Sequence, residues 1–191
     1  MGCSGAVARG FASDDSTGFL LCAAEPQWAL SRHAILAPMI DRNALRDELT
    51  ATWHREIPIV AAMGATVESY DGRSLAVRAP MQPNRNVHGT TFAGSLYSVC
   101  VLTGWGAVWL ALRERELDGT IYAAESAVQY RKAVASDFVC RCVTDVEALD
   151  AGLEQFKESG RASFDLACTI DHDGKRAVAF TGRYVVHAKR S

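Results

Sequence analysis

One stretch decides how this chain folds: Asn84-Arg85-Asn86-Val87-His88-Gly89-Thr90-Thr91-Phe92-Ala93-Gly94-Ser95-Leu96-Tyr97. It is a polar, glycine-punctuated turn that leads into an apolar segment ending near Leu112, and charged residues return only at Arg113. A helix of about twenty residues spans roughly 30 Å. Because this helix would be apolar all round, strands must wrap it to bury its whole circumference. We therefore predict a long central helix whose first turn offers unpaired backbone N–H groups to the preceding loop.

The same apolar segment, Thr91–Leu112, is long enough to cross a bilayer. It is rich in Gly, Ser and Thr, however, and amphipathic strands follow it rather than another span. A buried helix is therefore the better interpretation. The N-terminus lacks a signal-peptide pattern, and Ala6 stands where a myristoylation signal requires Ser or Thr. We expect a cytoplasmic protein that does not associate with membranes.

The composition argues against several other classes of protein. Net charge is -2 over 191 residues with both signs mixed, so there is no basic field of the kind that binds nucleic acid. The six cysteines form no C-x-x-C pair and no zinc spacing. We interpret them as reduced cytosolic thiols that behave as small apolar residues. No metal and no cofactor are expected.

Residues 1–38 are small and aperiodic, which is typical of a disordered leader or of a start site assigned upstream of a true initiator at Met39. The predicted domain covers 39–191. Its first element is a helix that begins at the N-cap Asp41 and continues to Gly64, with Pro58 placed to kink or end it.

Alternating patterns predict six strands around the central helix. Their ranges are Ala65–Tyr70, Ser74–Ala79, Thr120–Tyr130, Asp137–Glu147, Arg161–Asp171 and Lys175–His187. The segment Ala148–Ser159 is interpreted as a loop or a helical turn. The result is an α+β domain in which an antiparallel sheet of about six strands wraps one long helix.

This arrangement resembles the hot-dog fold. Residues Asn86–Gly94 resemble the Asn-x-x-Gly-Thr-x-His-Gly-Gly signature of hot-dog acyl-CoA thioesterases. Further segments are similar to the thioesterase domain of YiiD C-terminal type: Asn84-x-Asn86 before Gly-Thr-x-Phe, Gly94-Ser95-Leu96-Tyr97-Ser98, Gly104-Trp105-Gly106, Ala124-Glu125-Ser126 with Tyr130-Arg131, and Gly182-Arg183-Tyr184-Val185. The resemblance covers roughly residues 41–189. It implies hydrolysis of an acyl thioester on CoA or acyl carrier protein without a metal. It also implies a homodimer joined through the strand around Glu125, or a dimer of such dimers.

Thioester hydrolysis needs a polarised carbonyl and a positioned water. Gly94, or its neighbour Ser95, is the candidate backbone donor to the carbonyl oxygen, since a residue without Cβ lets the thioester approach closely. Asn86 matches the family asparagine that orients water or the carbonyl, and Asn84 is a weaker candidate of the same kind. Two simpler roles stay open: for Gly94, packing of the helix on the sheet alone, and for Asn86, an Asx-turn.

The carboxylate is the main departure from the family pattern. Many related thioesterases carry an acid in the central helix, at the position that holds Val101 here, and there is no Asp or Glu between Phe92 and Arg113. Glu125, a lone acid in an apolar strand, is therefore the candidate that directs water. The alternative is a solvent-facing residue, because Glu125 shares a strand face with Gln129.

The resemblance and the loop position give six candidate substrate-binding residues: Asn84, His88, Thr90, Phe92, Ser95 and Arg131. Two other functions remain open. A hot-dog enoyl hydratase is faintly indicated by Asn84-x-Asn86-Val87-His88, although the hydratase motif has Asp at the first position and a proline before the variable residue. A non-catalytic acyl-thioester-binding protein is indicated by Val101 in place of the acid.

Overall fold

The computed structural model describes residues 40–189; the predicted leader, residues 1–38, lies outside the described residues. The elements in chain order are α1 (Arg42–Glu56), α2 (Pro58–Met63), β1 (Thr66–Tyr70), β2 (Ser74–Ala79), the short 3-10 helix η2 (Gln82–Asn84), α3 (Ala93–Arg113), β3 (Gly119–Tyr130), β4 (Phe138–Val143), α4 (Val146–Ser159), β5 (Arg161–His172) and β6 (Lys175–Ala188).

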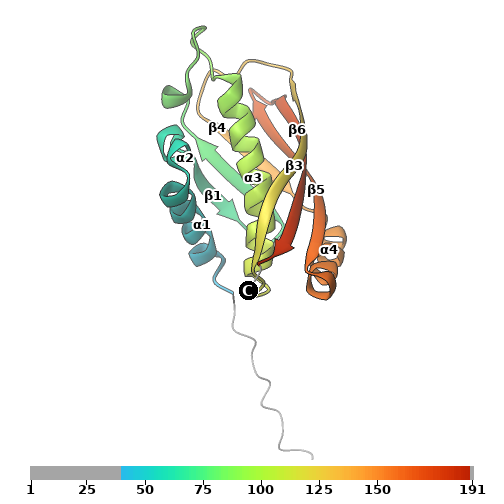
Figure 1. Ribbon diagram of the computed structural model, residues 1–191. Helices are drawn as coiled ribbons and strands as arrows, with labels where there is room; N and C mark the ends of the chain where they lie inside the picture. The colour runs from blue at the N-terminus through green and yellow to red at the C-terminus, as the bar shows by residue number, and fades with distance from the viewer. Residues whose placement is uncertain (1–39, 190–191) are drawn as a thin grey trace, which may run out of the picture. The chain divides into compact units, whose positions relative to one another are not determined.

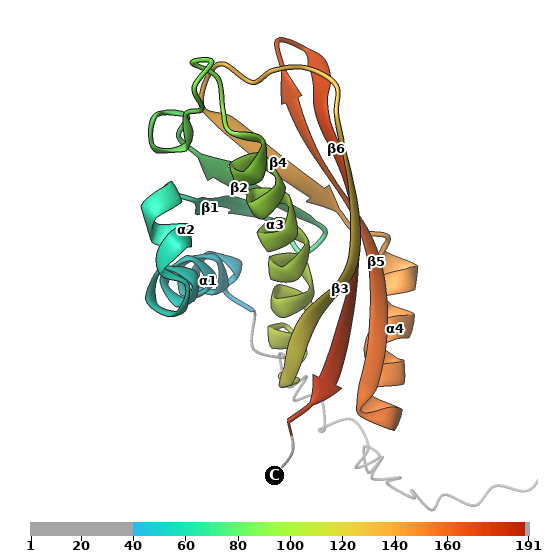
Figure 2. The same cartoon turned by 45° about the horizontal axis from the view of Figure 1, so that its top comes forward.

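The six strands form one antiparallel sheet in the order β1-β2-β4-β5-β6-β3. The sheet bends around α3, so that β2 and β4 lie on one side of the helix and β3 and β6 on the other (Figures 1 and 2). Helix α3 contacts every strand from β2 to β6. The predicted α+β architecture, with six strands around one long helix, is confirmed.

Helix α3 is the core of the domain. It has 21 residues, and 67% of its most apolar 18-residue segment is buried inside the fold, as expected for a central helix. The ring of Tyr184 fills the space next to Gly104, where a Cβ would overlap it, and Tyr184 Oη donates a hydrogen bond to the carbonyl of Val101 at 3.0 Å. Glycine therefore lets β6 approach the middle of the helix closely.

The predicted break at Pro58 is present, whereas one segment interpreted as a loop or a helical turn is a long helix. The helix expected from Asp41 to Gly64 is divided at Ile57, because Pro58 has no N–H to continue the first helix and instead begins α2. The segment interpreted as a loop or a helical turn is the 14-residue helix α4. Its N-cap Asp145 accepts a hydrogen bond from the backbone N–H of Ala148 at 3.1 Å.

Helix α4 is amphipathic, and its buried face shows why the loop prediction was wrong. Leu149, Leu153 and Phe156 recur at helical spacing and pack into a cluster with the second half of α3. Strand β4 consequently ends at Val143, four residues before the predicted end. The described cysteines Cys100, Cys140, Cys142 and Cys168 are free and buried.

Candidate active site at the N-terminus of α3

The first turn of α3 has free backbone donors. Its N-cap residue, Phe92, has no polar side chain, and no described side chain caps the helix. The N–H of Leu96 bonds to the carbonyl of Phe92 at 3.1 Å, which is the first bond within the helix. The N–H groups of Ala93, Gly94 and Ser95 lie before that bond. They sit at the positive end of the helix dipole, which favours an oxygen that gains negative charge.

Asn86 builds the loop that leads into this turn. Its Oδ1 accepts hydrogen bonds from the backbone N–H groups of His88 and Thr90, at 2.9 and 3.1 Å. Its Nδ2 donates to Thr90 Oγ1 at 3.0 Å and to the carbonyl of Thr91 at 3.2 Å. Both ends of the amide are thus engaged within the loop, which is the Asx-turn role that the sequence left open.

Asn84 ties this loop to α2. Its Nδ2 donates to the carbonyls of Met63 and Pro80, at 2.8 and 2.7 Å, and its backbone carbonyl accepts from the N–H of Phe92 at 2.7 Å. The residue is 3% exposed, yet its Oδ1 has no hydrogen-bond partner among the described residues. The same holds for Thr91 Oγ1. A buried acceptor without a donor is costly.

A cavity of about 320 Å³ lies at this end of α3. Its lining residues come from α2, η2 and the start of α3: Ile59, Ala62, Met63, Pro83, Asn84, Phe92, Gly94, Ser95 and Ser98. Four predicted site residues therefore line one cavity, namely Asn84, Phe92, Gly94 and Ser95. Most of the wall from α2 is apolar, and Phe92 itself is 55% exposed at the rim. Sequence reasoning missed the α2 residues, because no motif marks them, and it gave Ser98 no role although Ser98 ends the quoted segment Gly94–Ser98.

Three predicted binding residues lie outside this cavity lining. His88 is exposed on the loop. Thr90 contributes its hydroxyl to the contact with Asn86. Arg131 is exposed at the end of β3, where its Nη2 donates to Gln129 Oε1 at 2.8 Å. Within residues 40–189 there is also no cluster of three or more His, Cys, Asp or Glu that could hold a metal ion.

The described chain does not bring Glu125 to Gly94. A β-bulge interrupts the pairing of β3 with β6 between Ala123, which lies opposite Tyr184, and Glu125, which lies opposite Arg183. The extra residue shifts the alternation of the strand, so Glu125 points away from α3. Its side chain is 72% exposed.

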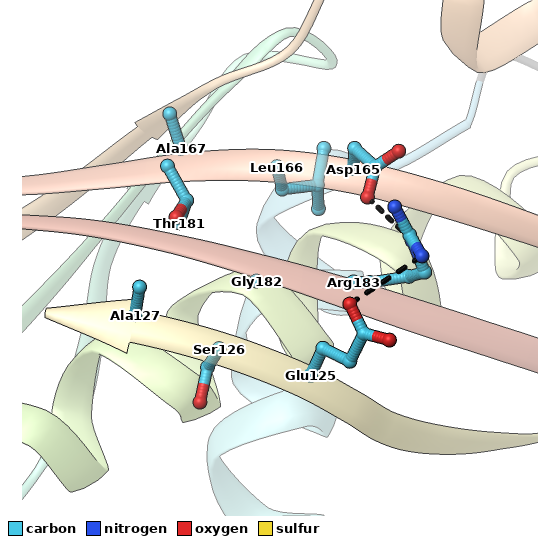
Figure 3. A pocket seen from close by; sticks show the side chains of 9 residues that line it. All are labelled: Glu125, Ser126, Ala127, Asp165, Leu166, Ala167, Thr181, Gly182 and Arg183. Carbon is cyan, nitrogen blue, oxygen red and sulfur yellow. Dashed lines mark hydrogen bonds and ion pairs between the residues drawn. The ribbon is translucent and has the colours of Figure 1, made fainter.

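On that outer face Glu125 belongs to an ion-pair network. Arg183 lies between two carboxylates, with Nη1 at 3.4 Å from Glu125 Oε2 and Nε at 2.9 Å from Asp165 Oδ1 (Figure 3). The hydrogen bond from Arg183 to Asp165, followed by the charge of Asp165 and then that of Glu125, raises the pKa of Arg183. The three side chains border a shallow depression of about 400 Å³ on the outer face of the sheet, away from the N-terminus of α3.

The bulge turns Ser126 toward α3 instead. Its hydroxyl lies 2.7 Å from Tyr97 Oη. A second phenol, Tyr130, donates to the carbonyl of Ala93 at 3.0 Å, and its partial burial raises its pKa. Hydroxyl groups from β3 and α3 therefore surround the first two turns of the helix on the side opposite α2. Sequence reasoning did not single out these three residues for chemistry.

Comparison with known proteins agrees with this fold. A family model described as "Putative thioesterase (yiiD_Cterm)" matches residues 46–188. A structure described as a putative thioesterase from Shewanella oneidensis is 32% identical, with 77% of this chain and 99% of that chain covered at a TM-score of 0.67. A protein of unknown function from Chlorobaculum tepidum is 28% identical, with 78% and 97% covered at a TM-score of 0.74. A probable thioesterase from Pseudomonas aeruginosa, 18% identical with 75% and 95% covered at a TM-score of 0.65, shares the fold. This chain belongs to the thioesterase family of YiiD C-terminal type and has the hot-dog fold.

Proposed function

We propose that this protein hydrolyses acyl thioesters, carried by CoA or by acyl carrier protein, at the N-terminus of α3. The observation that carries the proposal is the uncapped first turn of a 21-residue helix beside an apolar-walled cavity of about 320 Å³. In the proposed complex with substrate, the acyl chain lies in this cavity, along α2. The thioester carbonyl then lies over Gly94 and Ser95, within reach of their N–H groups.

The reaction adds water to the polarised carbonyl carbon. A C–O bond forms while the carbonyl electron pair moves to oxygen, where the helix N–H groups stabilise the charge. When this intermediate collapses, the C–S bond breaks, and the products are the carboxylate, the free thiol and one proton. Asn86 contributes by holding the loop and the first turn in place, rather than by contacting water directly.

The partner in the assembly is proposed to be a second copy of this chain. Strand β3 has 12 residues and lies at one edge of the sheet; within residues 40–189 it pairs with β6 alone, so its outer edge offers backbone groups that no described strand pairs with. Pairing of two β3 strands would bring the two α3 helices to one continuous sheet. Light scattering during size-exclusion chromatography tests this, and a monomer at micromolar concentration would contradict it. Four buried free thiols in the described chain are compatible with a reducing compartment such as the cytoplasm.

The experiment measures thiol release from acyl-CoAs of increasing chain length and from an acyl carrier protein substrate. The wild type is compared with Ala62→Phe, which fills the cavity, and with Ala61→Phe, whose site lies next to it on α2 but does not line the cavity. We expect Ala62→Phe to lose long-chain activity at least about tenfold, a barrier change of roughly 1.4 kcal/mol, while Ala61→Phe stays close to the wild type. A wild type without turnover on any substrate would overturn the proposal.

A non-catalytic acyl-thioester-binding protein is the second candidate. It is favoured by the absence of any carboxylate in α3 and by the outward position of Glu125. In a single-turnover assay with excess protein, binding without thiol release would select this function. The hydratase has less support, because His88 is exposed and lies outside the cavity lining.

A further inference from the structure

The polar groups on the β3 side of the first two turns of α3 are hydroxyls. Tyr97 Oη and Ser126 Oγ lie 2.7 Å apart, and Tyr97 is 36% exposed, so this pair is open to a ligand. The ring of Tyr97 is held edge-on against Phe180, with ring centroids 5.9 Å apart. The Tyr97 ring thus packs against the core residue Phe180, while its hydroxyl contacts β3.

Tyr97 begins the second turn of α3, just beyond the residues whose N–H groups lie before the first intrahelical bond. Tyr97 follows Gly94 by three residues, so both lie on neighbouring parts of the helix surface. Side chains of a helix point back toward its N-terminus, and a tyrosine hydroxyl reaches past its own turn. The contact of Tyr130 with the carbonyl of Ala93 shows that β3 passes beside that same turn.

The side of α3 that carries Tyr97 has no other reactive side chain in its first turns. Val101 follows Tyr97 by four residues on the same side of α3, and residues 93–113 contain no carboxylate. The cavity lies on the other side of Gly94, along α2. A thioester over Gly94 therefore has its acyl chain on one side and the hydroxyl pair on the other.

We propose that Tyr97 is a catalytic hydrogen-bond donor to the thioester carbonyl oxygen, and that Ser126 is the positioning residue that orients its phenol. This inference rests on the function proposed above. Before substrate arrives, the two hydroxyls share one hydrogen bond. With substrate bound, Ser126 donates to Tyr97 Oη, and the Tyr97 O–H donates to the carbonyl oxygen beside the backbone N–H groups of the helix. Tyr97 keeps its proton throughout; water supplies the oxygen that forms the new C–O bond, and the C–S bond breaks.

Such a chain of donors strengthens as charge develops on the carbonyl oxygen. The phenol thus acts more on the transition state than on the bound substrate, and its loss lowers kcat more than it changes KM. Removal of one donor of this kind typically costs about a hundredfold or more in kcat.

The test compares kcat and KM for thiol release in the wild type, Tyr97→Phe, Ser126→Ala and Ser126→Thr. Tyr122→Phe is the matched control, because it removes a phenol from β3, four residues before Ser126, but on the outer face, where Tyr122 packs edge-on with His187. Thermal unfolding of each variant shows whether it folds. Binding of a 2-oxoalkyl-CoA thioether, whose ketone accepts a hydrogen bond but is not hydrolysed, gives a readout that does not depend on turnover.

We expect Tyr97→Phe to lose about a hundredfold in kcat, while KM and the affinity for the ketone, which both report ground-state binding, each change by less than about threefold. Ser126→Ala should lose less, Ser126→Thr should recover most of the loss, and Tyr122→Phe should match the wild type. A folded Tyr97→Phe with wild-type kcat, in an active enzyme, would overturn this inference alone. A wild type without hydrolysis would overturn the proposed function and this inference together.

Discussion

The aromatic ring of Phe92 occupies the space in which a Cβ on Gly94 would stand. The N-cap residue therefore folds over the helix that it precedes, and the glycine is needed for that contact. Both residues line the cavity at the start of α3. The missing Cβ thus shapes the wall of the proposed site, in addition to leaving the backbone open to a thioester.

Substitution of Gly94 should separate stability from activity. Gly94→Ala displaces the Phe92 ring, which is exposed and free to turn, while alanine is favoured over glycine inside a helix by up to about 1 kcal/mol. We expect little change in the free energy of unfolding. Thiol release should fall at least about tenfold, because the methyl group and the displaced ring both fill the approach to the helix N–H groups.

A double variant distinguishes the two roles of Gly94. In a Phe92→Ala background the ring is absent, so a glycine needed only for that ring would tolerate Gly94→Ala without further loss. We expect the loss to persist, since the added methyl group still lies over the backbone donors. If the double variant is as active as Phe92→Ala alone, Gly94 serves packing alone.

Asn86→Asp should loosen the loop before α3. An ionised carboxylate cannot donate to Thr90 Oγ1 or to the carbonyl of Thr91, and it would face that carbonyl with a negative charge. We expect faster hydrogen exchange at the Thr90 amide together with a loss of activity of at least about tenfold. Lost activity with unchanged exchange at Thr90 would mean that Asn86 acts on the substrate or the water itself.

Glu125→Gln should leave hydrolysis nearly intact. Its side chain points away from α3, and Arg183 keeps its contact with Asp165 when the Glu125 charge is removed. We expect kcat to change by less than about threefold, a barrier change of less than about 0.7 kcal/mol. A tenfold or larger loss, measured by thiol release in a folded variant, would restore Glu125 as the group that directs water.

The turn between β1 and β2 should make stability depend on pH in the acid range. Hydrogen bonds from the backbone N–H groups of Ser74 and Arg73, at 2.6 and 2.8 Å, hold the pKa of Asp71 below its usual value. A carboxyl whose pKa is lowered on folding stabilises the fold above its unfolded pKa, about 3.9. That contribution is lost as the pH falls through the lower pKa of the folded state.

Asp71→Asn keeps an acceptor oxygen and removes the charge, so it isolates this effect. Denaturant unfolding at several pH values should show the variant less stable than the wild type at neutral pH. The difference should shrink below about pH 4. Glu158→Gln, on the exposed part of α4, is the control and should show no such trend. A difference that stays constant from pH 7 to pH 3 would contradict the assignment to the Asp71 charge.

Local sequence patterns determined most of the architecture. The uncharged run after Phe92 can only be stable when buried, and it forms the central helix; the alternating segments form the strands around it, with β2 bounded as predicted. The start of α3 was also visible, because the polar turn around Gly89 and the sudden end of charged residues mark it. Asn84, Phe92, Gly94 and Ser95 could therefore be placed at one site before any tertiary contact was known.

Tertiary structure alone decided which side chains face that site. A strand shows its two faces with a period of two, but the bulge before Glu125 depends on the pairing with β6 and shifts that period by one residue. It turns Glu125 to the outer face and Ser126 toward Tyr97, which is 29 residues away in sequence. Part of the cavity wall likewise comes from α2, and no local pattern records that α2 and the start of α3 line one cavity. Periodicity is a property of neighbouring residues, whereas the register of strands and the meeting of distant hydroxyls are set by the packing of the whole domain.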